Sequence, residues 1–159
     1  MYLFFDDNDI SNLLLERKVI SLQSYNDLFK FTKEKKQHKE QDIKIHRNED
    51  NYFKIIIRCS KINQLDFSVI LALGFYNSNQ IFKLRRYNGK SHFHMNKIEN
   101  VSFYNFHIHE ATERYQQIGF REETFAVETS DYSDLYSAIK LMIKQCNIII
   151  PEGAEHKLF

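Results

Sequence analysis

Apolar side chains follow two different periods along this chain, and the changes of period divide it into three parts. Up to residue 41 and again after residue 110 they recur at helical spacing, whereas between these parts they alternate with polar residues. Alternation is typical of a strand with one buried face. The pattern therefore predicts helices at both ends of the chain around a central sheet. The main predicted helices, with the residues that cap them, span 10–17 (Asp9), 22–33 (Ser21) and 132–147 (Ser130 or Asp131).

The central part holds short period-two runs separated by turn residues. Such short connections favour antiparallel pairing of neighbouring strands. The stretch 33–41, just before the first run, is polar on all sides, which indicates a frayed helix end or a solvated loop, with a basic arm for nucleic acid as the alternative. The first four runs cover 43–47, 52–60, 66–75 and 81–87, and a later one covers 101–109.

The pair Asn88-Gly89 lies between two alternating runs, and this dipeptide is the strongest short signal for a hairpin with a type I′ turn. A two-residue loop at this point sets Arg85 opposite His92 and Lys83 opposite His94. The register is supported by the apolar pattern, since a slip of one residue would mix the two faces. One face then holds Phe82, Leu84, Phe93 and Met95, apart from Arg86 and Ser91 near the turn. The other face holds Lys83, Arg85, Tyr87, His92 and His94, with Lys90 at the turn.

These elements together predict an α+β fold. We expect an antiparallel meander of five or six strands, with two N-terminal helices and a C-terminal helix packed on the apolar face. We expect a single domain over 1–159, made of a helical part (1–41), the sheet (42–109) and a second helical part (110–150).

Composition supports a folded chain and excludes little else. The chain is 43% hydrophobic and 14% aromatic, with one proline and four glycines, unlike a disordered protein. A formal net charge of +1 predicts no partner by itself. Cys59 and Cys146 lie far apart with no metal-binding spacing, which indicates two reduced thiols. No apolar run reaches the roughly 18 residues of a membrane helix, and the N-terminus lacks signal-peptide features. We therefore expect a cytoplasmic protein without a membrane partner.

Four of the seven histidines form two His-x-His pairs, His92/His94 and His107/His109. Side chains at positions i and i+2 of a strand point the same way, so each pair sets two imidazoles side by side. Imidazole changes its charge near neutral pH, which suits proton transfer, metal binding or anion binding.

The leading hypothesis is recognition and cleavage of RNA without a metal or other cofactor. One histidine would remove the 2′-OH proton, a second would protonate the leaving oxygen, and a cation would stabilise the phosphate. We choose His94 and His107 as this pair and Arg85 as the cation, with His109 beside them. The predicted substrate-binding residues are Lys54, Arg58, Lys83, Tyr87 as a ring for base stacking, and His92.

Two other hypotheses stay open. Four imidazoles could bind zinc or another divalent ion, but the predicted hairpin sets Lys83 and Arg85 beside them and no carboxylate lies on that face. Alternatively the histidines are only polar residues of a solvated sheet face, or part of a surface that binds a cognate protein. The sequence after the second pair predicts a helical turn in which Glu110 and Arg114 form an i,i+4 pair. The alternative is that Thr112 or Glu113 orients a histidine.

The block FHIHEATERYQQIGF, followed by AVETSDY and a helix ending IKQCNI, resembles a family of small uncharacterised bacterial proteins. The resemblance covers the C-terminal third and the preceding strand region, and it assigns no activity. It implies a role in a toxin–antitoxin or phage-defence locus, as a toxin, an antitoxin or an adaptor. It also implies a family pattern made of His107, His109, Thr112, Glu113, Tyr115 and Gln116.

Overall fold

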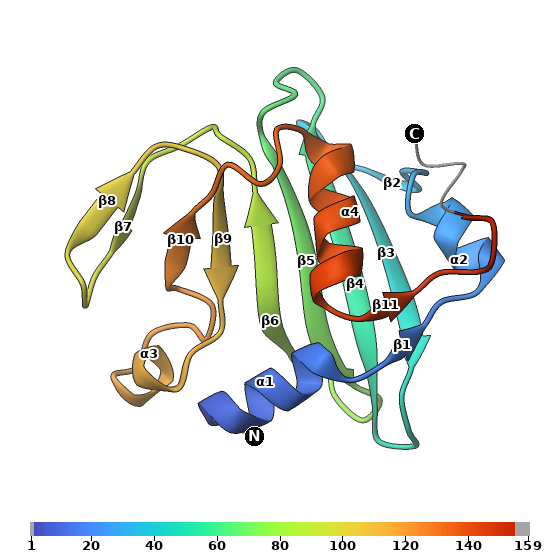
Figure 1. Ribbon diagram of the computed structural model, residues 1–159, viewed down its shortest axis with the longest axis horizontal. Coiled ribbons are helices and arrows are strands. Elements are labelled where there is room, and N and C mark those ends of the chain that lie inside the picture. The colour runs from blue at the N-terminus through green and yellow to red at the C-terminus, as the bar shows by residue number, and fades with distance from the viewer. Residues whose placement is uncertain (1, 155–159) are drawn as a thin grey trace.

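The computed structural model describes residues 2–154, and its centre is a seven-stranded antiparallel sheet (Figure 1). The spatial order is β10 (Ala126–Glu128), β9 (His107–Glu110), β6 (Ile81–Asn88), β5 (Phe67–Phe75), β4 (Asn51–Ser60), β3 (His38–His46) and β2 (Lys33–Glu34). Five strands, β2 to β6, follow one another as a meander, and two later strands, β9 and β10, extend the sheet beyond β6. This confirms the predicted α+β class, with one or two strands more than expected.

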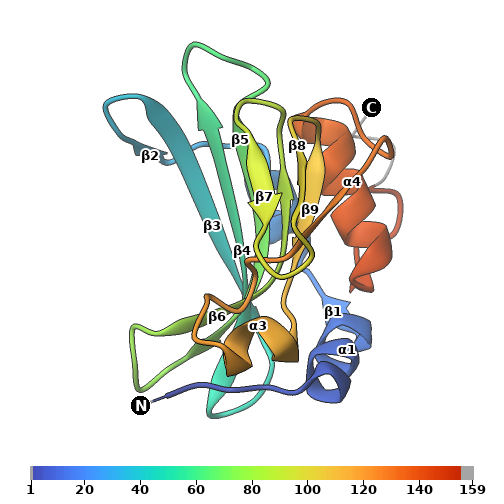
Figure 2. The same ribbon diagram turned by 90° about the vertical axis from the view of Figure 1, so that its left-hand side faces the viewer.

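Helices α1 (Asp7–Leu15) and α4 (Leu135–Gln145) lie on one side of this sheet (Figure 2). The inward side chains of the strands alternate as the sequence predicted, and they pack with the buried face of α4 into the core. The C-terminal helix therefore covers the apolar face, as expected. Its core partners on β4 and β5 include Ile55, Ile57, Val69 and Leu71.

Two small strand pairs lie outside the sheet. Strand β1 (Lys18–Val19) pairs in parallel with β11 (Ile148–Ile149), so the chain is joined close to both of its ends. Strands β7 (His94–Asn96) and β8 (Val101–Phe103) form a hairpin of their own, which leaves the sheet between β6 and β9. The predicted run 101–109 is thus two strands, broken by Tyr104, Asn105 and Phe106.

The helix boundaries differ from prediction by several residues. Asp6, not Asp9, caps α1, and Asp134 caps α4 in a capping box, so that helix is shorter at both ends. Ser21 caps α2 as predicted, but α2 (Leu22–Asp27) ends six residues earlier than expected. The short α3 (Glu113–Gln117) is followed by Gly119 at φ 88, which a glycine adopts without strain.

Most of the polar stretch 33–41 is neither a frayed helix nor a loop, because it forms β2 and the start of β3, and only residues 35–37 form the connection between them. Its side chains find charged partners instead of apolar ones. Lys33 lies 2.8 Å from Asp42, and Lys35 lies 3.3 Å from Glu40. Charged edge strands of this kind carry no apolar alternation, which is why the pattern failed there.

The predicted hairpin at Asn88-Gly89 is wrong. Strand β6 pairs with β9, and neither residue has the positive φ that a type I′ turn requires. The Gly89 N–H donates instead to the Phe67 carbonyl at 2.9 Å. A Cβ atom on Gly89 would lie 1.9 Å from the Leu65 carbonyl oxygen. The glycine is needed for this close approach of two backbones and not for a turn.

Among the described residues, no helix is long and apolar enough to cross a membrane. Both cysteines are free thiols.

Candidate active site: a histidine cluster beneath a hairpin

A β-bulge in β6 decides which of its side chains reach the histidines. Arg85 is level with Leu71 and Lys83 with Ala72, so Leu84 has no partner on β5. The extra residue reverses the alternation. Arg86 and Asn88 therefore point to the face opposite α4, which we call the open face, together with Lys83.

His107 and His109 lie on the same open face, directly beside these residues. In the register of β6 and β9, Arg86 is level with His109 and Asn88 with His107. The predicted i,i+2 geometry is therefore present in β9. His107 is 0% exposed and His109 is 4% exposed.

The two His-x-His pairs meet, although not through the predicted hairpin register. His94 stacks on His107 at 5.4 Å between ring centroids and lies edge-on to His109 at 4.8 Å. His92, which is exposed, lies 5.8 Å from His107. Phe103 from β8 closes the group at 5.4 Å from His107. Strand β9, strand β7 and the segment just before β7 thus bring four imidazoles into one cluster.

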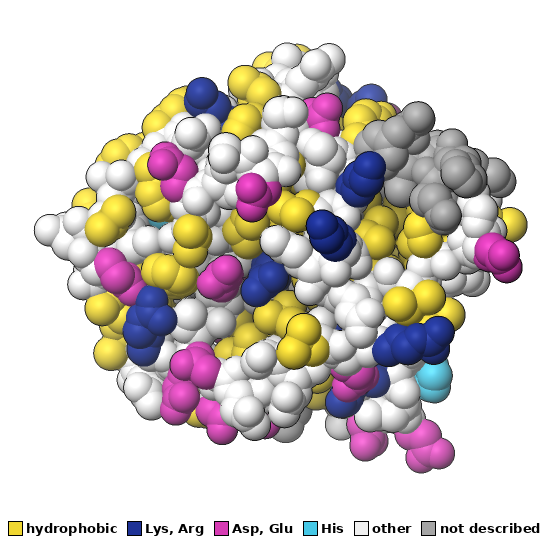
Figure 3. Space-filling model, viewed as in Figure 1, with side chains coloured by type: hydrophobic (Ala, Val, Ile, Leu, Met, Phe, Trp, Pro, Cys, Tyr) yellow, Lys and Arg dark blue, Asp and Glu magenta, His cyan; other side chains and the backbone are white. Residues whose placement is uncertain are grey.

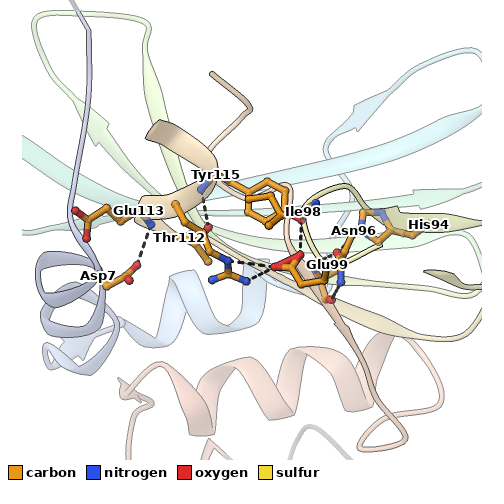
Figure 4. Close-up of polar contacts among 10 residues, drawn as sticks. Asp7, His94, Asn96, Ile98, Glu99, Thr112, Glu113 and Tyr115 are labelled. Carbon is orange, nitrogen blue, oxygen red and sulfur yellow. Dashed lines mark hydrogen bonds and ion pairs between the residues drawn. The ribbon is translucent and has the colours of Figure 1, made fainter. Parts of the chain in front are cut away.

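Five hydrogen bonds fix the β7–β8 hairpin in place over this cluster, and Figure 4 shows those at the hairpin tip. The Asn96 side chain donates to the Ala126 carbonyl at 2.7 Å and accepts from the Ala126 N–H at 2.9 Å, as a further strand would. At the hairpin tip, the Glu99 carboxylate accepts from the Tyr115 hydroxyl at 2.7 Å and from Arg114 at 2.6 Å. The Ile98 N–H donates to the same tyrosine oxygen.

Hydrogen bonds determine which ring nitrogen carries the proton in three of the neutral histidines. His107 Nδ1 donates to the Asn105 carbonyl at 2.8 Å, and His109 Nδ1 donates to the Glu123 carbonyl at 2.9 Å. Because the Asn96 oxygen also accepts from a backbone N–H, His94 Nε2 must be the donor in their 2.9 Å contact.

His107 has a partner on both ring nitrogens, since its Nε2 lies 3.5 Å from Asn88 Nδ2. Asn88 is held in turn by Ser68, whose hydroxyl donates to Asn88 Oδ1 at 3.0 Å. Among these three rings, His94 Nδ1 and His109 Nε2 are therefore the unprotonated nitrogens without such a partner.

Burial keeps these imidazoles neutral. It lowers the pKa of His107 to about 4 and that of His109 to about 2, and the positive charge of Arg86 lowers the His109 pKa further. The pKa of His94 is also lowered, again mainly by burial. His94, His107 and His109 are thus neutral bases and hydrogen-bond acceptors at pH 7.

One arginine and one glutamate complete the site. The Arg86 Nη2 atom lies 3.5 Å from Glu123 Oε2, and Glu123 is only 2% exposed. Arg86 Nε and Glu123 Oε2 are both buried without a hydrogen-bond partner among the described residues. Unsatisfied buried polar atoms of this kind call for a water molecule or a ligand.

Two predicted site residues lie elsewhere, because of the bulge. Arg85 and Tyr87 point to the side of α4, where the buried Tyr87 hydroxyl donates to Gln145 at 2.7 Å. Arg85 lies 3.9 Å from Glu110 on that side. The sheet therefore separates Arg85 from the histidines, and the fully buried Tyr87 ring has no free face on which a base could stack.

The three predicted cations on neighbouring strands do share the open face, but two of them have acidic partners. Lys54 lies 3.1 Å from Asp42, and Arg58 lies 3.6 Å from Glu40. Lys83 pairs with Ala72 of β5, and its strand β6 lies between the strands of the other two cations and the histidine strand β9. The predicted patch of positive charge is therefore largely a network of ion pairs, and Figure 3 shows the same mixture of signs on the α4 side.

The residues of the EATERYQ block support the elements around the histidine cluster. Thr112 caps α3, and Tyr115 anchors the hairpin. Gln116 holds the N-terminal segment through the backbone of Phe5. The predicted pair of Glu110 with Arg114 is not formed, since Glu110 faces Arg85 and Arg114 binds Glu99.

Within residues 2–154, no group of three or more histidine, cysteine, aspartate or glutamate side chains is arranged to hold a metal ion. The geometry thus gives the metal hypothesis no support. Sequence reasoning missed Arg86, Asn88, Asn96 and Glu123. Only for Arg86 was there a signal, because it was the one cation on the face of the predicted hairpin that was otherwise apolar apart from Ser91.

Comparison of the chain with protein-family models, with curated proteins and with solved structures finds no match.

Proposed function

We propose that this protein is an RNA-directed, toxin-like enzyme that cleaves single-stranded RNA without a metal. One observation carries the proposal: accessible and buried imidazoles form a single cluster beside Arg86 on the open face. Metal-free cleavage of RNA requires this set of groups, namely two proton-transfer residues and a cation near the phosphate.

The roles follow from the free nitrogens. His94 Nδ1 is unprotonated, and the lowered pKa keeps the ring neutral at pH 7, so that it can take the proton of the 2′-OH. The 2′ oxygen then bonds to phosphorus while the bond to the 5′ oxygen breaks, and protonated His92 gives that oxygen its proton. The products are a 2′,3′-cyclic phosphate and a 5′-hydroxyl end. Arg86 replaces Arg85 as the cation that stabilises the phosphate charge.

His107 takes a supporting role in this scheme, in place of the role predicted from sequence. Both of its nitrogens are engaged, and its ring lies in contact with His92 and His94. It therefore sets the positions of the two reacting rings without exchanging a proton itself.

The test is cleavage of a fluorescent single-stranded RNA by the purified protein in EDTA. We expect His92→Ala and His94→Ala each to lower the rate by about 10²–10⁴-fold, and Arg86→Met to lower it by a similar factor. His46→Ala is the matched control, because the exposed His46 lies on β3, which β6, β5 and β4 separate from the histidines of β9. Wild-type activity in the His92→Ala/His94→Ala double variant, or cleavage of a substrate without 2′-OH groups, would reject the proposal.

The biological setting is part of the same proposal. A toxin of a bacterial toxin–antitoxin or defence locus acts in the cytoplasm, where its RNA substrates and a cognate antitoxin are found. Expression of the wild-type protein should then arrest growth, and the His94→Ala variant should not.

Exposed apolar residues favour a second function, binding of a cognate protein. They gather on the hairpin and on β10, at the left of Figure 3. A partner that co-purifies with the wild-type protein, and still binds the His92→Ala/His94→Ala variant, would support an interaction module over an enzyme. The residues are Phe93, Met95, Ile98, Val101, Tyr104 and Val127.

A further inference from the structure

His92 lies at the end of a hydrogen-bonded chain that begins at a carboxylate on another segment. The Ser91 Oγ atom lies 3.3 Å from Asp66 Oδ1 and 3.2 Å from His92 Nδ1. A carboxylate can only accept, so the single hydroxyl proton of Ser91 goes to Asp66. The Ser91 oxygen then accepts from His92, which places the proton of the neutral ring on Nδ1 and leaves Nε2 free.

The carboxylate is held from its other side as well. His38 Nε2 lies 3.6 Å from Asp66 Oδ2, and Arg58 Nη2 lies 3.3 Å from His38 Nδ1. Arginine can only donate, so the proton of a neutral His38 ring is on Nε2, toward Asp66. The backbone of Asp66 is fixed too, since its carbonyl accepts from the Ser60 N–H and its N–H donates to the Asn63 carbonyl.

We propose that Asp66, acting through Ser91, is a positioning group for His92. The relay of Asp66, Ser91 and His92 fixes the ring rotation and makes Nε2 the nitrogen that exchanges protons with a ligand. Its consequence for catalysis rests on the proposed function, in which His92 protonates the leaving oxygen. Orienting partners of this kind typically change activity by about 10–100-fold.

The tautomer of His92 is measured directly by long-range ¹H–¹⁵N correlation NMR of the full chain, at a pH where the ring is neutral. The His92 signals are assigned from the spectrum of His92→Gln. We expect the proton on Nδ1 in the wild type and in Ser91→Thr, which keeps the hydroxyl. In Asp66→Ala and Ser91→Ala it should move to Nε2, the site that a free histidine ring prefers. Asp50→Ala, an exposed aspartate in another turn, is the control.

Kinetics on single-stranded RNA supply the second readout. We expect Asp66→Ala to lower kcat by about 10–100-fold with KM changed less than twofold, and Ser91→Thr to retain kcat. If the His92 tautomer is the same in the wild type and Asp66→Ala, the relay is wrong. If the wild type cleaves RNA and Asp66→Ala cleaves equally well, the positioning role is wrong. If the wild type shows the expected tautomer but no cleavage, the proposed function fails and the relay stands.

Discussion

At the scale of single residues, the main feature is a pair of histidines buried without charge. His107 and His109 each give one ring proton to a backbone carbonyl, and burial lowers both pKa values far below the ordinary 6.5. A base whose pKa is lower in the folded state binds protons first in the unfolded state. Acid therefore favours unfolding.

We predict that stability falls as the pH drops from 6.5 toward 4. For His107 alone the change corresponds to about 2–3 kcal/mol by pH 4.5, and His109 adds a similar amount. Urea unfolding at pH 7.0, 5.5 and 4.5 measures this loss. In His109→Gln the loss should be smaller by roughly 2 kcal/mol, whereas His46→Gln should match the wild type. An equal pH dependence in His109→Gln would show that this ring binds its proton equally readily in the folded and unfolded states.

Residue patterns alone predicted the histidine pairs but not their neighbours. The i,i+2 rule placed His107 and His109 side by side correctly. The bulge at Leu84 has no signature in the apolar pattern, and it exchanged Arg85 for Arg86 in the site. Glu123 lies in a loop whose course depends on tertiary contacts, so no local rule could have found it.

At the scale of elements, strands with an apolar face were predicted well and charged or interrupted ones were not. Strands β4, β5 and β6 lie within a few residues of their predicted bounds. The predicted hairpin at Asn88-Gly89 is not formed, because long-range pairing outweighs the local turn signal and β9 pairs with the edge of β6 instead. The glycine of that signal is explained by packing against the segment that precedes β5.

We predict that Gly89→Ala destabilises the fold by about 2–4 kcal/mol. The new Cβ atom would collide with the Leu65 carbonyl, and neither backbone can give way without loss of the two hydrogen bonds made there. Thermal or urea unfolding measures the change. Lys90→Ala, at an exposed neighbouring position, should stay within about 0.5 kcal/mol of the wild type. Similar stabilities for the two variants would contradict this close approach.

At the scale of the whole molecule, one buried lysine connects the C-terminal ends of α1 and α4, which lie far apart in the sequence. Lys18 is 1% exposed, and its Nζ donates to the carbonyls of Leu14, Glu16 and Cys146 at 2.7–3.0 Å. These carbonyls terminate α1 and α4, whose last turns lack partners for them. Burial lowers the pKa of Lys18 to about 8. Sequence gave no sign of this role, because Lys18 looks like any surface lysine.

We predict that Lys18→Met lowers the free energy of unfolding by about 2–4 kcal/mol at pH 7, because three carbonyls lose their donor, two of them in buried hydrogen bonds. Lys36→Met, at an exposed position, is the control. The wild type should also gain stability between pH 8 and 10.5, since the unfolded state still holds the lysine proton that the folded state has released. This gain should be missing in Lys18→Met, and its persistence there would assign it to another group.

The amide of Asn96 has one more consequence. It occupies the outer N–H and carbonyl of Ala126 on β10, the last strand of the sheet. An unprotected outer strand is a template on which other chains can aggregate. Loss of the hairpin would thus expose the imidazoles to solvent and would also leave β10 with unpaired backbone groups. The Asn96 side chain therefore protects the molecule from edge-to-edge aggregation as well as holding the hairpin over the histidines.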